Sequence, residues 1–416
     1  MSSANGVGRG KGAGAIIAVF AVSRCLLLLC VFRVLVVPGP DVTSDVDVIY
    51  QGWYEVLRTG TYPLDDVTWQ YPPAAALAIL APGAVPFLGY PSAFFVLASL
   101  ADCAVFALLL YASGRAGKSR TGSWIWVWGV ALLGPTAYAR YDLMVTAVAV
   151  AALLAGVRRP RVLGALAAFG ALLKVWPVLL LARAPRRAWA SAAVTAVGFL
   201  LLCHALAPGA FAFLTFQRER GTEVESLGSL VFHVARHVGW QGHVQLNYGS
   251  VEFLGPYVPL VSTLAMGLTA VAFGWLLLWR LRARGGGPGT LADAAFTAVL
   301  LFTTTSRVIS PQYLIWLVGL AAVCLVFPDS PMTRPAKLVL AAAGVTLLEF
   351  PLLFSHVVAS DWLGVLLLLV RNGLLVVASV GACRRLWRAT VPGRDASAGV
   401  ARVFSALAAQ ASRSRT

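Results

Sequence analysis

The side chains best suited to chemistry begin with a pair of aspartates, Asp45 and Asp47, in the segment SDVDVIYQGWYEVLRTGTYP. A carboxylate within hydrogen-bond reach of a hydroxyl can take its proton while that hydroxyl attacks another centre. Apolar and aromatic residues recur at helical spacing after Asp47, which predicts a short amphipathic helix in the membrane interface. The two acids lie near its start, where the helix dipole favours negative charge, so a helix cap or a solvated acid is the alternative.

A second group combines cations with hydrogen-bond donors. Arg140, Tyr141 and Asp142 follow one another between two apolar runs, and Lys174 stands alone in ALLKVWP. The planar fork of an arginine matches a phosphate group, although Arg140 and Asp142 are also compatible with a helix-end ion pair. A lysine in an apolar run costs about 2.5–3.5 kcal/mol on insertion scales. We therefore expect an anionic group, protein or ligand, close to Lys174.

A third group of polar residues lies further along the chain. It comprises the charged segment TFQRERGTEVES, with Arg218, Glu219, Arg220, Glu223 and Glu225, and the segment SRVISPQYLIWL, with Arg307, Gln312 and Tyr313. Tyr71 belongs to an earlier segment, WQYPP, whose two prolines also suit a purely structural role. A surface charge network is the alternative for 218–225. The glutamine of SPQY, at a helix start near lipid, requires a hydrogen-bonding partner.

The elements that must position these side chains are membrane helices. Of the 416 residues, 59% are hydrophobic and 12% are charged, and the chain contains roughly ten long apolar runs. About 20 apolar residues cross a bilayer as a helix, and open strands would leave backbone groups unpaired in lipid. The sequence predicts an all-α polytopic membrane protein with spans near 14–37, 92–113, 124–139, 141–156, 190–207, 258–281, 291–306, 309–327, 337–356 and 361–382.

The net charge of +16 does not indicate nucleic-acid binding, because the basic residues form short clusters that flank the apolar runs. That distribution is the positive-inside pattern of membrane proteins. It divides the chain into a membrane domain over 1–383 and a basic cytoplasmic tail over 384–416, which we expect to be disordered. A tail rich in arginine suits a position against anionic cytoplasmic lipid.

The same charge rule predicts two segments that do not cross the membrane. With the N-terminus in the cytoplasm, a full crossing by 72–90 would place the basic loop at 115–120 outside. Basic clusters flank 162–182 on both sides, and Lys174 and Pro177 interrupt it. We expect both segments to be re-entrant or juxtamembrane; the alternative for 162–182 is one basic cluster outside. The loops 38–70 and 209–257 are then external, and the longer one is expected to fold over the membrane surface.

The order of motifs resembles glycosyltransferase family 87. Asp45 and Asp47 are followed by QYPP, ARYDL, LLKVWP, RERG…ES and SPQYLIW, so the resemblance covers about 45–315. It implies a GT-C fold, an inverting mechanism and a catalytic aspartate in the first external loop. The family's acid precedes an aromatic residue by about four positions. Asp45 stands four before Ile49 and Asp47 three before Tyr50, which modestly favours Asp45 while leaving both as candidates.

The resemblance also implies the reaction. It is the transfer of a hexose, mannose in the family, from a polyprenyl-phosphate sugar to a lipid or glycan acceptor on the extracytoplasmic face of the plasma membrane. The candidate donors to the leaving phosphate and the substrate are Arg140, Tyr141, Lys174, Arg218, Arg220, Arg307, Gln312, Tyr313 and Tyr71. Because basic side chains can neutralise a lipid monophosphate, we expect no metal and no cofactor.

Two alternatives come from other classes of protein. A transporter or lipid flippase would also have about ten spans, broken helices and buried charge. The absence of an evident inverted repeat and the gathering of polar residues on one face argue against it. A purely structural membrane subunit is disfavoured by the isolated Lys174, which is expensive to insert into a membrane.

Overall fold

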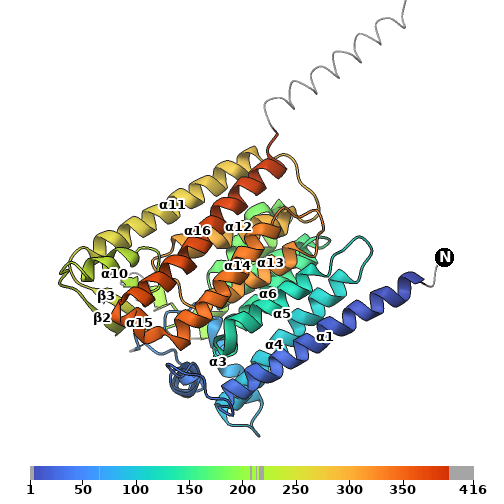
Figure 1. Cartoon of the computed structure of the whole chain (residues 1–416). Coiled ribbons are helices and arrows are strands. Elements are labelled where there is room, and N and C mark those ends of the chain that lie inside the picture. The colour runs from blue at the N-terminus through green and yellow to red at the C-terminus, as the bar shows by residue number, and fades with distance from the viewer. Residues whose placement is uncertain (1–3, 65, 207–208, 212, 215–219, 393–416) are drawn as a thin grey trace, which may run out of the picture.

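A computed structural model describes residues 4–64, 66–206, 209–211, 213–214 and 220–392, with the side chains of 4–12 and 206 excepted. The protein is a bundle of helices whose axes run broadly along one direction (Figure 1). Six of the helices are long and apolar enough to cross a membrane. They are α1 (Ala4–Val31), α4 (Tyr90–Ser113), α8 (Arg186–Leu206), α11 (Val258–Arg282), the pair α14 (Thr333–Leu347) and η5 (Leu348–Leu352), and α16 (Trp362–Thr390).

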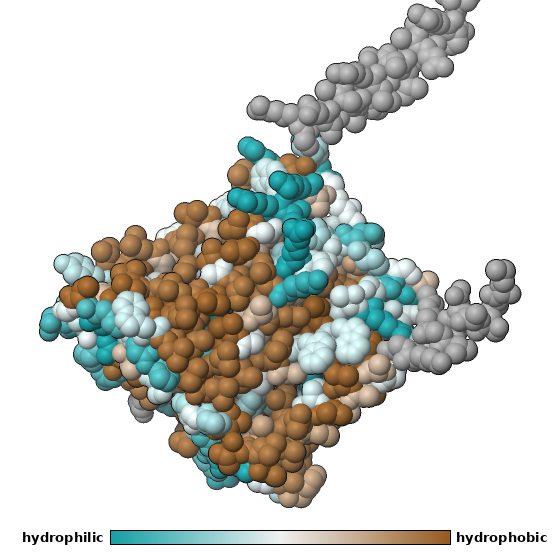
Figure 2. All heavy atoms as spheres, viewed as in Figure 1, coloured by the Kyte–Doolittle hydropathy of each residue, from teal (hydrophilic) through white to brown (hydrophobic). Residues whose placement is uncertain are grey.

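Shorter apolar helices fill the centre of the bundle. They are α5 (Thr121–Leu133), α6 (Asp142–Gly156), α12 (Thr290–Thr305) and α13 (Tyr313–Cys324). Nearly every residue of α13 is buried, whereas much of α8 and α11 faces outward. Figure 2 shows the result as a broad apolar belt between two polar ends. The prediction of an all-α polytopic membrane protein is confirmed.

The bundle has two chemically different ends. One end, here called the basic end, carries the connections 114–120, 157–159, 283–289 and 325–332, and α16 ends there. These connections touch one another, since Ser119 N donates to Val326 O and Arg284 N donates to Thr390 O. The opposite end, here called the sheet end, carries the strands, α10 (Leu230–Arg236) and α15 (Phe354–Ala359) (Figure 1).

The segment 72–90 does not cross the bundle. It forms α3 (Ala75–Leu80) and the 3-10 turn η2 (Ala81–Ala84), which together are too short to span a membrane. Pro82, near the start of η2, has no backbone N–H to continue the α-helical hydrogen bonds. The expectation of a re-entrant or juxtamembrane segment, rather than a full span, agrees with these lengths.

The segment 162–182 is a re-entrant pair. Helix α7 (Pro160–Leu173) rises from the basic end, the backbone becomes extended at Lys174, and η4 (Trp176–Arg183) returns. The guanidinium of Arg183 donates to the carbonyl of Ala283, 3.2 Å away, which places the end of η4 back at the basic end. Pro177 stands in the first turn of η4, where its missing N–H costs no helical hydrogen bond. The charge pattern therefore predicted this turn correctly.

The described part of the loop 209–257 folds over the sheet end of the bundle. A three-stranded antiparallel sheet is ordered β1 (Thr222–Glu223), β3 (Ser250–Leu254) and β2 (His243–Asn247). It packs with α10 and the start of α16 around a small apolar cluster that includes Val224, Phe232 and Phe253. At the other end, α16 continues to Thr390, beyond the boundary at 383 placed from the sequence, and 393–416 lie outside the described residues.

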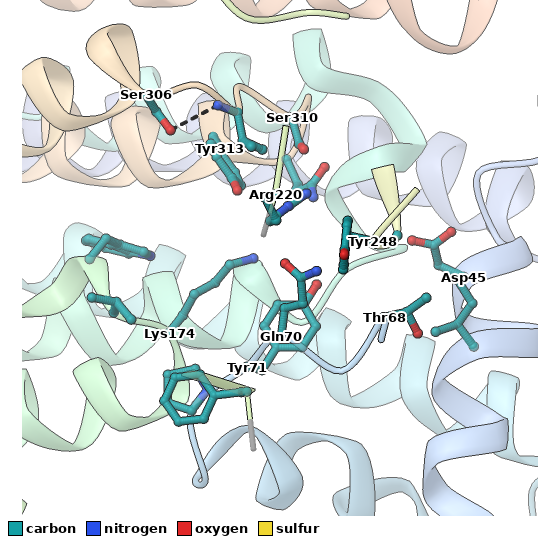
Figure 3. A pocket seen from close by; sticks show the side chains of 18 of the residues that line it. Asp45, Thr68, Gln70, Tyr71, Lys174, Arg220, Tyr248, Ser306, Ser310 and Tyr313 are labelled. Carbon is teal, nitrogen blue, oxygen red and sulfur yellow. Dashed lines mark hydrogen bonds between the residues drawn. The ribbon is translucent and has the colours of Figure 1, made fainter. Parts of the chain in front are cut away.

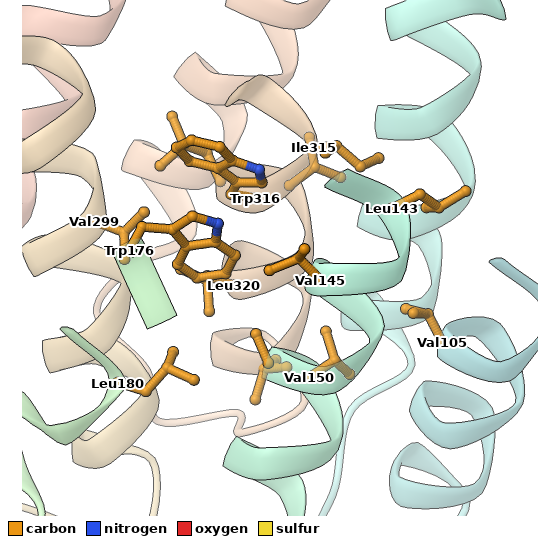
Figure 4. Close-up of a cluster of buried hydrophobic side chains, with 14 of the residues drawn as sticks. Val105, Leu143, Val145, Val150, Trp176, Leu180, Val299, Ile315, Trp316 and Leu320 are labelled. Carbon is orange, nitrogen blue, oxygen red and sulfur yellow. The ribbon is translucent and has the colours of Figure 1, made fainter. Parts of the chain in front are cut away.

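The main core joins the short central helices. Trp176 of η4 stacks on Trp316 of α13, with ring centroids 5.2 Å apart, among branched aliphatic side chains (Figure 4). Two charges inside the bundle are paired: Arg24 Nε lies 2.7 Å from Asp102, and Trp126 donates to the same carboxylate at 2.7 Å. A buried carboxylate with this many donors avoids the cost of an isolated charge.

Candidate active site

A cavity of about 400 Å³ opens at the sheet end, above the turn at Lys174. Its walls come from the first long loop, the re-entrant turn, the sheet and the connection between α12 and α13. In Figure 3, Lys174, Gln70 and Arg220 point into one space, and Asp45 faces it beside Thr68 and Tyr248. The lining is mostly aromatic and apolar with a few charged groups, which is the usual make-up of a small-molecule site.

Asp45 is positioned by a short helix that lies across the bundle. The π-helical turn η1 (Asp45–Tyr50) continues into α2 (Gln51–Leu57). Val46, Tyr50 and Trp53 are buried beneath it, while Val48 is exposed. The predicted amphipathic helix is therefore present, and its start places the Asp45 side chain on the cavity wall.

Arg140 orients Asp45. Its Nη2 lies 2.8 Å from Asp45 Oδ2, and its Nη1 donates to the carbonyls of Val42 at 3.0 Å and Ala139 at 2.7 Å. Arg140 is buried and does not line the cavity. Through these contacts the Arg140 guanidinium fixes the orientation of the Asp45 carboxylate and does not face a ligand in the cavity.

Asp47 occupies a different environment, although it lies only two residues further on. It pairs with Arg33 and accepts from Thr43, outside the cavity lining. Arg33 also binds Asp41 at 2.8 Å. Burial alone would raise the pKa of Asp41, but hydrogen bonds from Thr43 and the charge of Arg33 hold it below its usual value. Asp47 thus belongs to a surface network that holds the start of the loop.

Lys174 has the anionic partner that its position demanded. Its Nζ donates to both oxygens of Asp142, at 2.7 and 2.9 Å, and Trp316 Nε1 donates to Asp142 at 2.7 Å. The sequence suggested Arg140 as the partner of Asp142. Instead, Arg140 pairs with Asp45 and Asp142 pairs with Lys174.

An aromatic cage surrounds the Lys174 ammonium. The ring centroids of Tyr71, Tyr141, Tyr313 and Trp316 lie 5.2–5.4 Å from Nζ. Rings at this distance attract a cation through their negative faces. Tyr141 is buried and does not line the cavity, and its hydroxyl donates to Leu173 O at 3.3 Å. The cage and Asp142 together hold Lys174 at the cavity floor.

Two arginines complete the cationic lining. Arg220 donates to Ser250 Oγ at 2.8 Å, and its Nε lies 3.6 Å from Glu252. Arg307 donates to Ser262 Oγ at 3.3 Å. Burial and the nearby charge of Arg220 lower the pKa of Arg307, against an opposing effect of Glu252. Two guanidinium groups that repel each other in this way create a site attractive to an anion.

Glu223, in the segment 218–225, positions the SPQY loop. Ser310 Oγ donates to Glu223 at 2.7 Å, and Glu223 N donates to Arg307 O at 3.1 Å. These bonds place Gln312 and Tyr313 on the cavity wall, where Tyr313 stacks on Trp316.

Glu225 points away from the cavity toward a buried ion pair. Arg371 donates to Glu349 at 2.7 Å and lies 3.8 Å from Glu225. Burial, with repulsion from Glu349 and Glu223, raises the pKa of Glu225 well above its usual value. The contacts of Glu225 therefore suit a structural role at the junction of the loop and α16.

Seven of the residues predicted as site residues line the cavity: Asp45, Tyr71, Lys174, Arg220, Arg307, Gln312 and Tyr313. Asp47, Arg140 and Tyr141 lie outside its lining. Arg218 falls outside the described residues, as does Glu219. Three cations and one carboxylate, Asp45, thus share the lining, and Asp142 and Glu252 lie behind it against Lys174 and Arg220. In the described part of the chain, no three His, Cys, Asp or Glu side chains gather as metal ligands.

The sequence analysis missed Tyr248. The register that pairs Asn247 with Ser250 leaves Tyr248 and Gly249 as a two-residue hairpin loop, with φ values of 48° and 74°. Positive φ at both positions is the requirement of a type I′ turn. A bulky residue rarely adopts it, and such backbone often marks a functional site. The signal in the sequence is NYGS, an Asn and a Gly around an aromatic residue.

Comparison with known proteins identifies the family. The sequence model of glycosyltransferase family 87 matches residues 69–311, more than half of the chain. The chain belongs to glycosyltransferase family 87. No curated protein and no solved structure matches it. The matched range contains the cationic side chains of the cavity and begins after Asp45.

Membership of family 87 favours a membrane glycosyltransferase over the transporter, flippase and structural-subunit alternatives. A glycosyltransferase needs a sugar donor, an acceptor and a group that handles the acceptor proton. The cavity at the sheet end offers charged and aromatic side chains suited to these tasks.

Proposed function

We propose that this family 87 enzyme transfers a hexose, mannose, from a polyprenyl-phosphate sugar to a lipid or glycan acceptor. The observation that carries the proposal is that one carboxylate, Asp45, shares a cavity with Lys174, Arg220 and Arg307. A base and a cationic phosphate site are the two features that such a transfer requires. Aromatic side chains between them offer flat apolar surfaces for a sugar ring.

The proposed reaction is a single displacement. The acceptor oxygen attacks the anomeric carbon, its proton passes to Asp45, and the bond from that carbon to the phosphate oxygen breaks. The phosphate leaves with the bonding electrons, and attack from the opposite side inverts the anomeric configuration. Arg140 acts as a positioning residue, because it holds the Asp45 carboxylate toward the cavity. General base catalysis of this kind contributes about 10²- to 10⁴-fold in rate.

The leaving phosphate gains charge, and fixed cations stabilise it. Lys174, Arg220 and Arg307 are held by protein contacts before any substrate binds, so little reorganisation is needed at the moment of reaction. Because three cationic side chains line one cavity and can donate to a single phosphate, we propose transfer without a metal ion. Phe213, Leu214 and Phe302 add apolar lining suited to the first isoprene units of the donor.

The proposed orientation places the sheet end outside the plasma membrane. The basic end carries the clustered arginines, and such clusters are retained in the cytoplasm. In a background without the six native cysteines, an impermeant thiol reagent should label Ser44→Cys at the sheet end from outside intact cells. Gly287→Cys, exposed at the basic end, should react only after permeabilisation. Labelling in the reverse pattern would contradict the orientation.

The reaction itself is tested with the purified protein in proteoliposomes. We expect radiolabelled mannose to move from polyprenyl-phosphate-mannose to membrane acceptors, undiminished by a chelator. A nucleotide-activated mannose should not replace that donor. Transfer that depends on the nucleotide sugar, or that stops on chelation and returns with a divalent cation, would contradict the proposed donor and the metal-free mechanism.

A further inference from the structure

A second cavity, of about 450 Å³, lies at the basic end, far along the bundle from the candidate active site. It is formed where α4 ends, between the adjoining ends of α6 and α7 and the connection after α13. Its floor is apolar and includes Leu108, Leu154, Leu166 and Val326. No residue lining it also lines the active-site cavity.

Three cations converge on the rim of this cavity, here called the basic pocket: Arg115, Lys118 and Arg158. In the described part of the chain, none of them has an acidic partner within 4.0 Å. Burial and the charges of Arg115 and Arg158 lower the pKa of Lys118, against an opposing effect of Asp329. Like charges that crowd one another in this way attract an anion.

Neighbouring rings hold two of the cations at the mouth of the pocket. The Lys118 ammonium lies 3.8 Å from the centroid of Phe327, and the Arg115 guanidinium lies 4.7 Å from that of Tyr111. Cation–π contacts restrict these side chains while leaving their N–H donors for another acceptor. The rim is therefore partly organised before a ligand arrives.

The position of the basic pocket along the membrane helices favours one class of anionic ligand over another. Helix α4 is long and apolar enough to cross the membrane, so its end at Ser113 and the connection that follows lie near the lipid headgroups. Tyr111, which lines the pocket, and Leu100, further along α4, are both exposed. A ligand with a negative headgroup and a long apolar tail matches both the rim and this surface. A small soluble anion matches only the rim.

We propose that the basic pocket binds an anionic phospholipid, its phosphate at Arg115, Lys118 and Arg158 and an acyl chain against the apolar floor and α4. Basic pockets between membrane helices at the cytoplasmic side bind such headgroups. The site is separate from the sugar-transfer cavity, so it does not depend on the proposed donor or acceptor.

The test titrates the purified full-length protein with dioleoyl phosphatidylglycerol or dioleoyl phosphatidylcholine and counts bound lipids by native mass spectrometry. We expect the anionic lipid to bind at least tenfold more tightly. The triple variant Arg115→Ala, Lys118→Ala and Arg158→Ala should lose roughly a hundredfold in that affinity, at about fivefold per cation. Equal binding of the two lipids by the unchanged protein would overturn the proposal.

A matched control removes the same charge elsewhere at the basic end. Arg186, Arg187 and Arg282 are exposed and lie outside the pocket, so their alanine variant should keep the preference for the anionic lipid. An equal loss in both triple variants would show that surface charge alone attracts the lipid, which overturns the site.

A further variant tests the floor of the pocket and the source of the phosphate. Leu154→Trp keeps all three cations and fills the floor, so it should weaken phosphatidylglycerol binding. Unchanged binding by this variant would contradict an acyl chain in the pocket. Competition by inorganic phosphate at the lipid's own concentration would show a soluble anion site and overturn the assignment to a lipid.

Discussion

Replacing Lys174 by methionine is expected to destabilise the protein by about 3–5 kcal/mol, because the change leaves a buried carboxylate without its cation. Asp142 is 1% exposed and takes two hydrogen bonds from Lys174, at 2.7 and 2.9 Å. After the substitution, Asp142 keeps the hydrogen bond from Trp316 Nε1, at 2.7 Å. Methionine has nearly the length of lysine, so the loss of stability comes from the missing charge and hydrogen bonds rather than from a new cavity.

The double variant Asp142→Asn with Lys174→Met should recover most of that loss, because no buried charge is then left unpaired. Asp142→Asn alone should cost less than Lys174→Met alone. The aromatic cage still attracts the lysine cation, whereas its rings offer a carboxylate nothing comparable. The free energy of unfolding in detergent micelles, measured for the full cycle of variants, checks these differences.

Activity separates the structural role of Lys174 from its proposed role in catalysis. A charge-assisted hydrogen bond to the leaving phosphate is worth about 1.5–3 kcal/mol, or roughly 10- to 160-fold in rate. The double variant should therefore be stable and slow. A Lys174→Met variant as stable as the unchanged protein would refute the account of the buried pair. A stable double variant with full activity would refute a contact between Lys174 and the phosphate.

Two further predictions concern the fold. His233 is buried, with Nε2 donating to Val224 O and Nδ1 accepting from Ser360, and burial lowers its pKa to about 4 from 6.5. The unfolded chain takes up the proton first on acidification, so stability should fall by about 3 kcal/mol between pH 6.5 and 4. His233→Gln should flatten that part of the profile, and an unaltered profile would contradict the assignment. A Cβ at Gly164 would clash with the carbonyl oxygen of Ala188, so Gly164→Ala should lower the unfolding midpoint. Gly198→Ala, where the added Cβ meets open space, should not lower it. Equal effects of the two substitutions would contradict the packing of α7 on α8.

The turn at Lys174 shows what could be predicted from the sequence. The segment 162–182 has basic residues on both sides, and a lysine and a proline interrupt it. Because basic clusters are retained on the cytoplasmic side, both ends of the segment were expected on that side, which indicated a re-entrant pair. The presence of an anion near Lys174 was predicted from the cost of inserting an unpaired lysine into a membrane. Its identity was not predicted, since Asp142 is distant in sequence and reaches Lys174 only when α6 and α7 pack together.

The pairing of Arg140 illustrates a second limit. Sequence proximity suggested Asp142 as its partner, but Asp142 begins α6 and faces Lys174, while Arg140 reaches Asp45 across the chain. Tyr248 was missed for a different reason. Its place in the cavity depends on the register of β2 and β3 and on positive φ in their loop, neither of which a tyrosine signals by itself.

The most direct test of the central claim compares Asp45→Asn with Asp47→Asn in the reconstituted transfer assay, with unfolding midpoints measured alongside. The account predicts that Asp45→Asn lowers the transfer rate by about 10²- to 10⁴-fold while the protein stays folded. Asp47→Asn, which alters a side chain outside the cavity lining, should stay within a few-fold of the unchanged enzyme. Full transfer by Asp45→Asn, or a loss confined to Asp47→Asn, would contradict the assignment of Asp45 as the base.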